Sequence, residues 1–277
     1  MESFAETYGT PVGGLTVEDK ETNLKISGGI FNDIVIGGGG AAGSGNTSTV
    51  VTSNLEITGG TFGSKTSSTN IFAGGAAFDS GTATINESNL TIDGSDKNLN
   101  LLFANNGIYA GGLNSGVSKK TTLTLKNLTE DMFGIKAGIY GGSRAESTGV
   151  SIEDGDTEIN ISNSYLYADV YGGGRSSGAG SILKAGKSKI TVSNTSVSGY
   201  ENTGTTWTGR IFGAGYIRGG SLYEQKSTEV VINNVIGVTY DKESEEISNS
   251  EGARVYGGGY NFKDGTEDKA QLKSRFY

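Results

Sequence analysis

The sequence predicts an all-β fold, a single-stranded parallel β-helix (solenoid) of about seven irregular coils. Three observations lead to this prediction. One motif recurs seven times along the chain: a β-branched residue, then a large apolar residue, then small residues. A second motif, a pair of apolar residues at positions i and i+2, recurs between the copies of the first. The third observation is that one of the two intervals between the motifs is nearly constant while the other varies.

The first repeated motif ends in glycine or another small residue. Its first copy also satisfies the Gly-x-Gly-x-x-Gly pattern of dinucleotide-binding turns, through Gly38, Gly40 and Gly43. A dinucleotide site needs a helix after this turn, but the following residues alternate in polarity as in a strand. Seven copies indicate architecture rather than a cofactor site, so we expect no cofactor. The copies start at Val35, Ile71, Ile108, Ile139, Val170, Ile211 and Val255.

The second repeated motif is a pair of aliphatic residues separated by one polar residue, which predicts a strand with one buried face. From a glycine motif to the next pair the chain takes 17 to 22 residues, whereas from a pair to the next glycine motif it takes 9 to 23. A stacked solenoid explains this difference, because length changes are confined to loops on one side. The pairs are Leu24/Ile26, Leu55/Ile57, Leu90/Ile92, Leu123/Leu125, Ile159/Ile161, Ile190/Val192 and Val230/Ile232.

Stacked coils place equivalent residues in columns along the solenoid. We expect an aromatic column of Tyr109, Tyr140, Tyr171, Phe212 and Tyr256, packed as core or wall. Glycines are expected to allow sharp corners at positive φ. Asparagines recur beside the pairs, before some and after others, so they form either a hydrogen-bonded ladder or a chance alignment. They are Asn23, Asn54, Asn89, Asn127, Asn163, Asn194 and Asn234.

Composition excludes several classes of function. The chain has 277 residues with 47 Gly and one Pro, and its net charge of −8 makes nucleic acid a poor partner. Because Cys and His are absent, the chain can form no disulfide, no zinc site built on these residues and no Ser-His-Asp triad. No stretch approaches the ~20 apolar residues of a membrane-spanning helix.

The texture of "GGTF", "VYGGG" and "ITVSN" segments resembles the right-handed parallel β-helix regions of bacterial surface proteins, in particular the passenger domains of autotransporter adhesins. The resemblance covers about residues 14 to 262. It implies an exported protein on the exterior of the bacterial outer membrane that binds a host or bacterial surface glycan or protein, with self-association as a further possibility. Because no C-terminal membrane barrel is recognisable, we expect either a passenger fragment or a protein anchored in another way.

We expect residues 1–20 to form an N-terminal cap, residues 21–262 the coils, and residues 263–277 a C-terminal cap or linker. The alternative fold is a seven-bladed β-propeller. A blade needs four strands in about 40–50 residues, and several repeats here are only 31 residues long, so the solenoid is preferred.

Candidate ligand-binding residues lie mostly in the long arms of the last two coils, where exposed aromatic side chains suit a sugar ring or a protein anchor. Two arginines of one expected column, Arg144 and Arg175, repel each other unless an acid or an anionic ligand lies between them. The aromatic and basic candidates of the arms are Tyr200, Trp207, Arg210 and Tyr240.

We expect no catalytic residue, metal site or enzymatic activity. The alternative is a polysaccharide lyase or glycoside hydrolase on the same scaffold, which needs clustered carboxylates. The densest acidic run, Glu153 to Glu158, lacks the spacing of a calcium loop and is expected to be a solvated turn.

Overall fold

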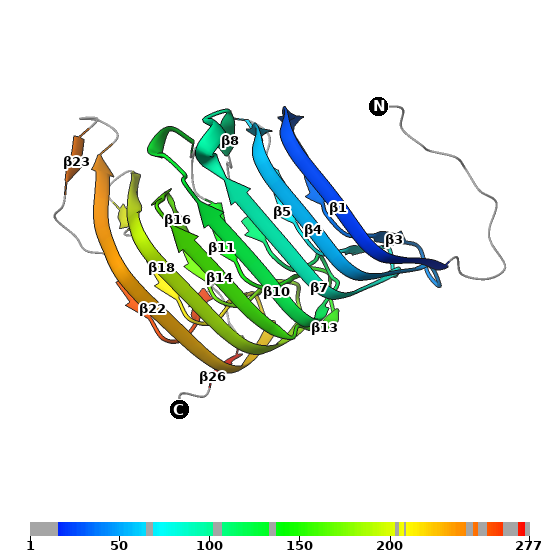
Figure 1. The fold of residues 1–277 in the computed structure, drawn as a ribbon. Coiled ribbons are helices and arrows are strands. Elements are labelled where there is room, and N and C mark those ends of the chain that lie inside the picture. The colour runs from blue at the N-terminus through cyan, green and yellow to red at the C-terminus, as the bar shows by residue number, and fades with distance from the viewer. Residues whose placement is uncertain are drawn as a thin grey trace.

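The computed structural model is a stack of parallel strands, coloured from the N-terminal to the C-terminal end in Figure 1. It describes residues 16–64, 69–101, 107–132, 137–202, 205–207, 209–241, 246–248, 254–262 and 271–274. The stack is a parallel β-solenoid and not a propeller, as predicted. It has about 5 turns, slightly fewer than expected. Seven strands nevertheless stack in the second sheet.

Three sheets run along the stack, and each coil adds strands to them in turn (Figure 1). The first sheet holds the long strands. They follow the order β1 (Thr16–Phe31), β4 (Thr47–Phe62), β7 (Thr82–Asp93), β10 (Val117–Lys126), β14 (Asp156–Ser162), β18 (Ile182–Asn202), β22 (Leu222–Asp241) and β23 (Glu246–Ser248). Shorter strands that pair with these are β8 (Leu99–Leu101), β13 (Ser151–Glu153), β15 (Tyr165–Leu166), β19 (Thr205–Trp207) and β26 (Gln271–Ser274).

The second and third sheets consist of short strands. The second follows the order β2 (Ile34–Ile36), β5 (Asn70–Phe72), β9 (Gly107–Tyr109), β11 (Ala137–Tyr140), β16 (Ala168–Tyr171), β20 (Arg210–Phe212) and β24 (Arg254–Tyr256). The third sheet consists of β12 (Arg144–Ala145), β17 (Arg175–Ser176), β21 (Tyr216–Arg218) and β25 (Tyr260–Phe262). Single β-bridges through Leu113 connect this sheet to a separate pair of strands, β3 (Gly40–Ala42) and β6 (Ala76–Phe78). Two short 3-10 helices, η1 (Gly94–Asp96) and η2 (Glu130–Met132), interrupt the arms.

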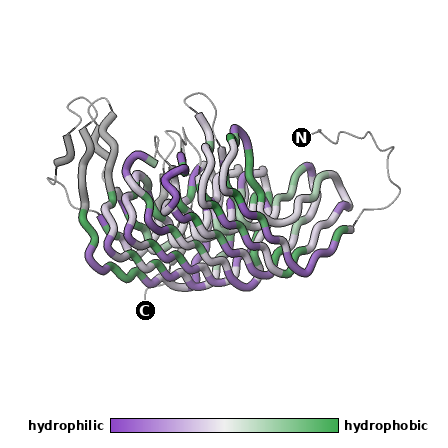
Figure 2. Tube along the Cα trace, turned by 45° about the horizontal axis from the view of Figure 1, so that its top comes forward, coloured by the Kyte–Doolittle hydropathy of each residue, from purple (hydrophilic) through white to green (hydrophobic). Residues whose placement is uncertain are grey.

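The aliphatic pairs stack in register, as the sequence predicts. Leu55 pairs with Leu24 and Leu90, and the same register continues through every pair to Val230 and Ile232. Apart from Ile232, which is 39% exposed, these side chains and the first residues of the glycine motifs from Val35 to Ile211 form one continuous interior cluster, with Leu24 and Val230 partly buried against it. Figure 2 shows the accompanying alternation of hydrophobic and hydrophilic residues along the coils. Burial of this shared cluster provides the main stabilisation of the stack.

A column of hydroxyl groups lies two residues before the aliphatic pairs from Leu55/Ile57 onward, and all but the last are buried. Each of these hydroxyls donates a hydrogen bond to the backbone carbonyl oxygen of the third residue of a glycine motif. Examples are Ser88 to Ala110 at 2.6 Å and Thr228 to Gly257 at 2.6 Å. These bonds satisfy backbone carbonyls that the corner would otherwise leave unpaired. The donors are Ser53, Ser88, Thr121, Thr157, Ser188 and Thr228.

The glycines of the motifs serve a different purpose from the expected one. Glycine corners at positive φ do occur, as predicted, at nine described glycines outside the repeated motifs, but none of the described motif glycines has a positive φ. Instead, neighbouring coils approach too closely for a side chain. A Cβ at Gly172 would lie 2.1 Å from the carbonyl oxygen of Gly213, and one at Gly213 would lie 2.4 Å from that of Gly257. The small residues therefore allow the backbones to stack at the corner.

The asparagines form two ladders rather than one. This explains why some of them precede their aliphatic pair in the sequence and others follow it. Asn23, Asn54 and Asn89 precede their pairs and align on the outer face of the first sheet, with amide hydrogen bonds of 3.0 and 2.9 Å. The other four follow their pairs and adopt left-handed backbone conformations, with φ between 48° and 57°. In this second ladder Asn234 donates to Asn194 at 2.9 Å, and Asn194 to Asn163 at 3.4 Å.

The long arms carry the length differences, as expected. In the last two coils β18 and β22 extend past the body of the sheet and turn back as the antiparallel strands β19 and β23. At the N-terminal end β1 begins at Thr16, inside the segment expected as a cap, and residues 1–15 lie outside the described residues. At the C-terminal end β26 pairs with β22, and the other residues of 263–277 lie outside them.

Candidate functional site

Three of the predicted aromatic residues lie in one row of hydrogen-bonded strands at the extended end of the first sheet. Trp207 in β19 pairs with Tyr200 in β18, and Tyr200 pairs with Tyr240 in β22. The row continues from Tyr240 to Ile247 in β23. The side chains of Tyr200, Trp207 and Tyr240 lie outside the described residues. The backbone register thus joins residues of two different arms at one place.

A second cluster of aromatic residues lies on the outer face of the second sheet. It is called here the outer cluster and consists of Phe72, Ala76, Tyr109, Leu113, Tyr140, Tyr171 and Phe212, with Ile34, Ile36 and Tyr216 packed against it. Consecutive rings from Phe72 to Tyr256 stack with centroids 4.6–5.0 Å apart and interplanar angles of 5–12°. The predicted aromatic column is confirmed and extends by one ring, Phe72, beyond the expected set.

The two column arginines cover this outer cluster. Arg144 and Arg175 are register partners in the third sheet, as expected, and Tyr216 continues their column. Arg144 is buried, with 9% of its surface exposed. Its guanidinium forms an ion pair with Glu146 and lies 6.0 Å from the Tyr109 ring centroid. Arg175 is half-buried and its guanidinium lies 5.3 Å from the Tyr216 ring centroid.

Arg210 also joins this cluster. Its Nε donates to Asp169 Oδ1 at 3.0 Å, its Nη2 donates to Asp169 Oδ2 at 2.5 Å, and the side chain is 13% exposed. The guanidinium lies 5.4 Å from the Phe212 ring centroid. This two-point ion pair ties β20 to β16 and gives Arg210 a structural role in the stack.

Burial strongly raises the pKa of two tyrosines in the outer cluster, Tyr140 and Tyr171. Tyr171 donates to Asp169 at 3.3 Å. Both phenols therefore stay neutral at physiological pH.

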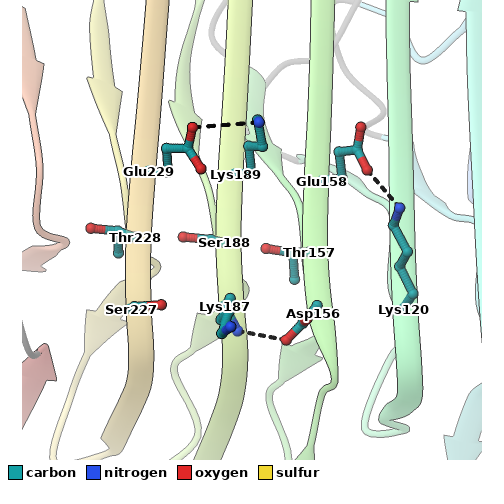
Figure 3. A pocket seen from close by; sticks show the side chains of 10 residues that line it. All are labelled: Lys120, Asp156, Thr157, Glu158, Lys187, Ser188, Lys189, Ser227, Thr228 and Glu229. Carbon is teal, nitrogen blue, oxygen red and sulfur yellow. Dashed lines mark hydrogen bonds and ion pairs between the residues drawn. The ribbon is translucent and has the colours of Figure 1, made fainter. Parts of the chain in front are cut away.

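A shallow hollow of about 410 Å³ lies on the outer face of the first sheet (Figure 3). Its charges alternate from strand to strand, and Lys120 pairs with Glu158 at 2.6 Å and Lys189 with Glu229 at 3.4 Å. The hydrogen bonds from Lys120 and Asn160 outweigh burial and hold the pKa of Glu158 below its usual range. The hollow is lined by Lys120, Asp156, Thr157, Glu158, Lys187, Ser188, Lys189, Ser227, Thr228 and Glu229.

The acidic run from Glu153 to Glu158 is not the solvated turn that the sequence predicts. Its residues end β13 and begin β14, and Asp154 is buried at 6% exposure. The Asp154 carboxylate accepts hydrogen bonds from the Val117 amide at 3.0 Å, the Ser143 amide at 2.7 Å and the Ser143 hydroxyl at 2.7 Å. Burial raises its pKa despite these bonds. Asp154 thus cross-links coils as a structural group.

Sequence reasoning missed Asp169, the hydroxyl column and the hollow. Asp169 and Arg210 occupy equivalent positions, two residues before an aromatic residue of the column. The hydroxyl column is visible in the sequence as Ser or Thr two residues before each of the seven aliphatic pairs. The hollow has no linear signal, because its residues come from four different strands.

Among the described residues, no group of three acidic side chains is arranged to hold a metal ion. Within the same part of the chain, no helix has the length and apolar character needed to cross a membrane. Comparison with known proteins adds no assignment: no family model matches the chain, and neither a curated protein nor a solved structure matches it significantly.

Proposed function

We propose that this protein is a bacterial surface or secreted β-solenoid that acts as an adhesin or structural stalk and binds a host glycan or protein without catalysis. The observation that carries this proposal is the register of Trp207, Tyr200 and Tyr240 on strands that extend past the body of the stack. Aromatic residues gathered at one place are typical of sites for sugar rings and protein anchors. The solenoid supplies a rigid support for such a site.

The charged side chains of the outer cluster and the first sheet fit this non-catalytic proposal. Arg144, Arg210, Lys120 and Lys189 each form an ion pair with a carboxylate on their own or a neighbouring strand. Groups held in such pairs stabilise the stack and present a polar exterior to water.

The test compares Trp207→Ala with Phe78→Ala, which removes an exposed ring from β6. Both variants and the parent protein are applied to a glycan array and to host cells, and circular dichroism checks the fold. The proposal expects Trp207→Ala to lose at least tenfold in binding while Phe78→Ala binds as the parent does. Equal binding by all three proteins, each with an intact fold, contradicts it.

A second candidate function is polysaccharide cleavage at the hollow of Figure 3, where three carboxylates and three lysines from neighbouring strands face the same depression. Asp156, Glu158 and Glu229 are the carboxylates. The test is incubation with polyuronates and Ca²⁺ while new ultraviolet absorbance is followed. A product that Glu158→Gln abolishes would replace the adhesin proposal by an enzymatic one.

A further inference from the structure

Three of the described arginines lie at the outer cluster, but only two of them form an ion pair with a carboxylate. Arg144 pairs with Glu146, and Arg210 pairs with Asp169. Arg175 lies between these two arginines in the stack, and over the described ranges no carboxylate lies within ion-pair distance of its guanidinium. A largely enclosed charge without a counter-ion is costly, and the neighbouring guanidinium of Arg144 adds repulsion.

Unpaired donors gather at the same place. Within the part of the chain that the structure describes, the Nε atoms of Arg175 and Arg144 are buried and have no hydrogen-bond partner. Arg144 has only 9% of its surface exposed and both Nε atoms are buried, so water does not compensate them. Buried donors without partners are rare in folded proteins and call for a ligand or another explanation.

The surroundings of Arg175 suit a planar anion. Its guanidinium lies over the Tyr216 ring, 5.3 Å from the centroid, and the residue is half-buried, so that solvent reaches part of it. Guanidinium groups bind carboxylates through two parallel hydrogen bonds, and such a pair is stronger where water is partly excluded.

From these observations we propose that Arg175, together with its register neighbour Arg144, forms a binding site for a carboxylate ligand on the outer cluster. The carboxylate neutralises the excess charge and takes hydrogen bonds from the Arg175 guanidinium. This site is separate from the row of Trp207, Tyr200 and Tyr240, and the inference does not rest on the proposed adhesin function.

The test follows the Nε–H signals of arginine in ¹⁵N–¹H correlation spectra of the full chain, assigned with Arg144→Lys, Arg175→Lys and Arg210→Lys. Sodium acetate and sodium glucuronate are titrated, with sodium chloride at equal ionic strength as the reference. We expect a saturable shift of the Arg175 signal, and of the neighbouring Arg144 signal, with a dissociation constant of about 1–10 mM, as for one partly enclosed charge-assisted pair. The Arg210 guanidinium is already bound to Asp169, so its signal should shift no more with either carboxylate than it does with sodium chloride.

Two further comparisons complete the test. Arg175→Gln removes the saturable response of the Arg144 signal, while Trp207→Ala leaves the Arg175 response unchanged, which separates this site from the aromatic row. A response at Arg175 that matches chloride, fails to saturate or appears equally at Arg210 overturns the proposal. A response to glucuronate alone identifies an acidic sugar as the preferred carboxylate, whereas equal responses to both probes identify a site for simple carboxylates.

Discussion

The ring of Tyr140 lies 4.6 Å from the ring of Tyr109 and is tilted from it by only 5°. These residues are 31 positions apart and occupy the same place in successive coils. Tyr140 also stacks on Tyr171 at 4.9 Å, so one side chain links three coils outside the aliphatic interior.

Replacing Tyr140 by Ala therefore opens a cavity in the outer cluster. We expect a loss of about 3–5 kcal/mol in the free energy of unfolding, as for other buried aromatic residues. The measurement is denaturant unfolding followed by circular dichroism. Tyr140→Phe is the matched control and keeps the ring, so it costs less than about 1.5 kcal/mol. Equal losses for the two variants would show that ring stacking is not what stabilises these coils.

Gly172→Ala tests the explanation of the glycine motifs. The added Cβ would lie 2.1 Å from the carbonyl oxygen of Gly213, and backbone cannot move aside as a flexible side chain can. We expect a loss of about 3 kcal/mol from overpacking. In the control, Gly40→Ala, the nearest atom to the Cβ is 3.9 Å away, and stability changes by less than about 0.5 kcal/mol. Tolerance of Ala at position 172 would contradict close stacking at the corner.

Asn194 tests the second asparagine ladder. It has a φ of 48°, accepts a hydrogen bond from Asn234 and donates one to Asn163. Asn194→Ala loses the amide and strains the backbone, which together cost about 2–3 kcal/mol. Asn194→Gly loses the amide but tolerates the conformation, so its thermal unfolding falls between those of the parent and the Ala variant. An Ala variant as stable as the Gly variant would show that the left-handed corner is not required.

Asp93 should make stability depend on pH. Burial raises its pKa, but hydrogen bonds from Ser95, Asn127 and Lys126 outweigh this and hold the pKa well below the ordinary value of 3.8. Because the folded protein lowers this pKa, the stabilisation is present above pH 3.8 and is lost as the pH falls below it. Denaturant unfolding of the parent and of Asp93→Asn is compared at about pH 7 and pH 2.5. The difference between them should shrink at the lower pH, and a difference that stays constant would exclude this role.

Much of the fold is readable from the sequence because stacking imposes a repeat on it. The pair Leu55/Ile57 and the aromatic Tyr140 fall in their predicted columns, since each coil must offer the same residue type to the same neighbours. The sequence shows only that motif glycines are small. It does not distinguish a positive φ at Gly172 from a close contact with Gly213, because both favour the same residue.

The candidate sites are less predictable because they depend on partners from other coils. Asp154 looks like part of a solvated acidic run, yet Val117 and Ser143, from other strands or turns, surround its carboxylate. From the sequence, Arg210 is expected to bind ligand together with Trp207, but its guanidinium forms an ion pair with Asp169 of the preceding coil. Neither partner lies at a spacing that a linear motif marks.

The central claim is that successive coils stack in the stated register, and paired cysteines test it most directly because the chain has no cysteine of its own. Thr91 and Thr124 are register partners in β7 and β10, whereas Thr122 pairs with Asn89. The solenoid predicts that oxidation of the T91C/T124C variant forms an intramolecular disulfide in nearly all molecules, as mass spectrometry would detect, while T91C/T122C forms little. Equal cross-linking of the two variants, or none in T91C/T124C, would contradict the stacked register.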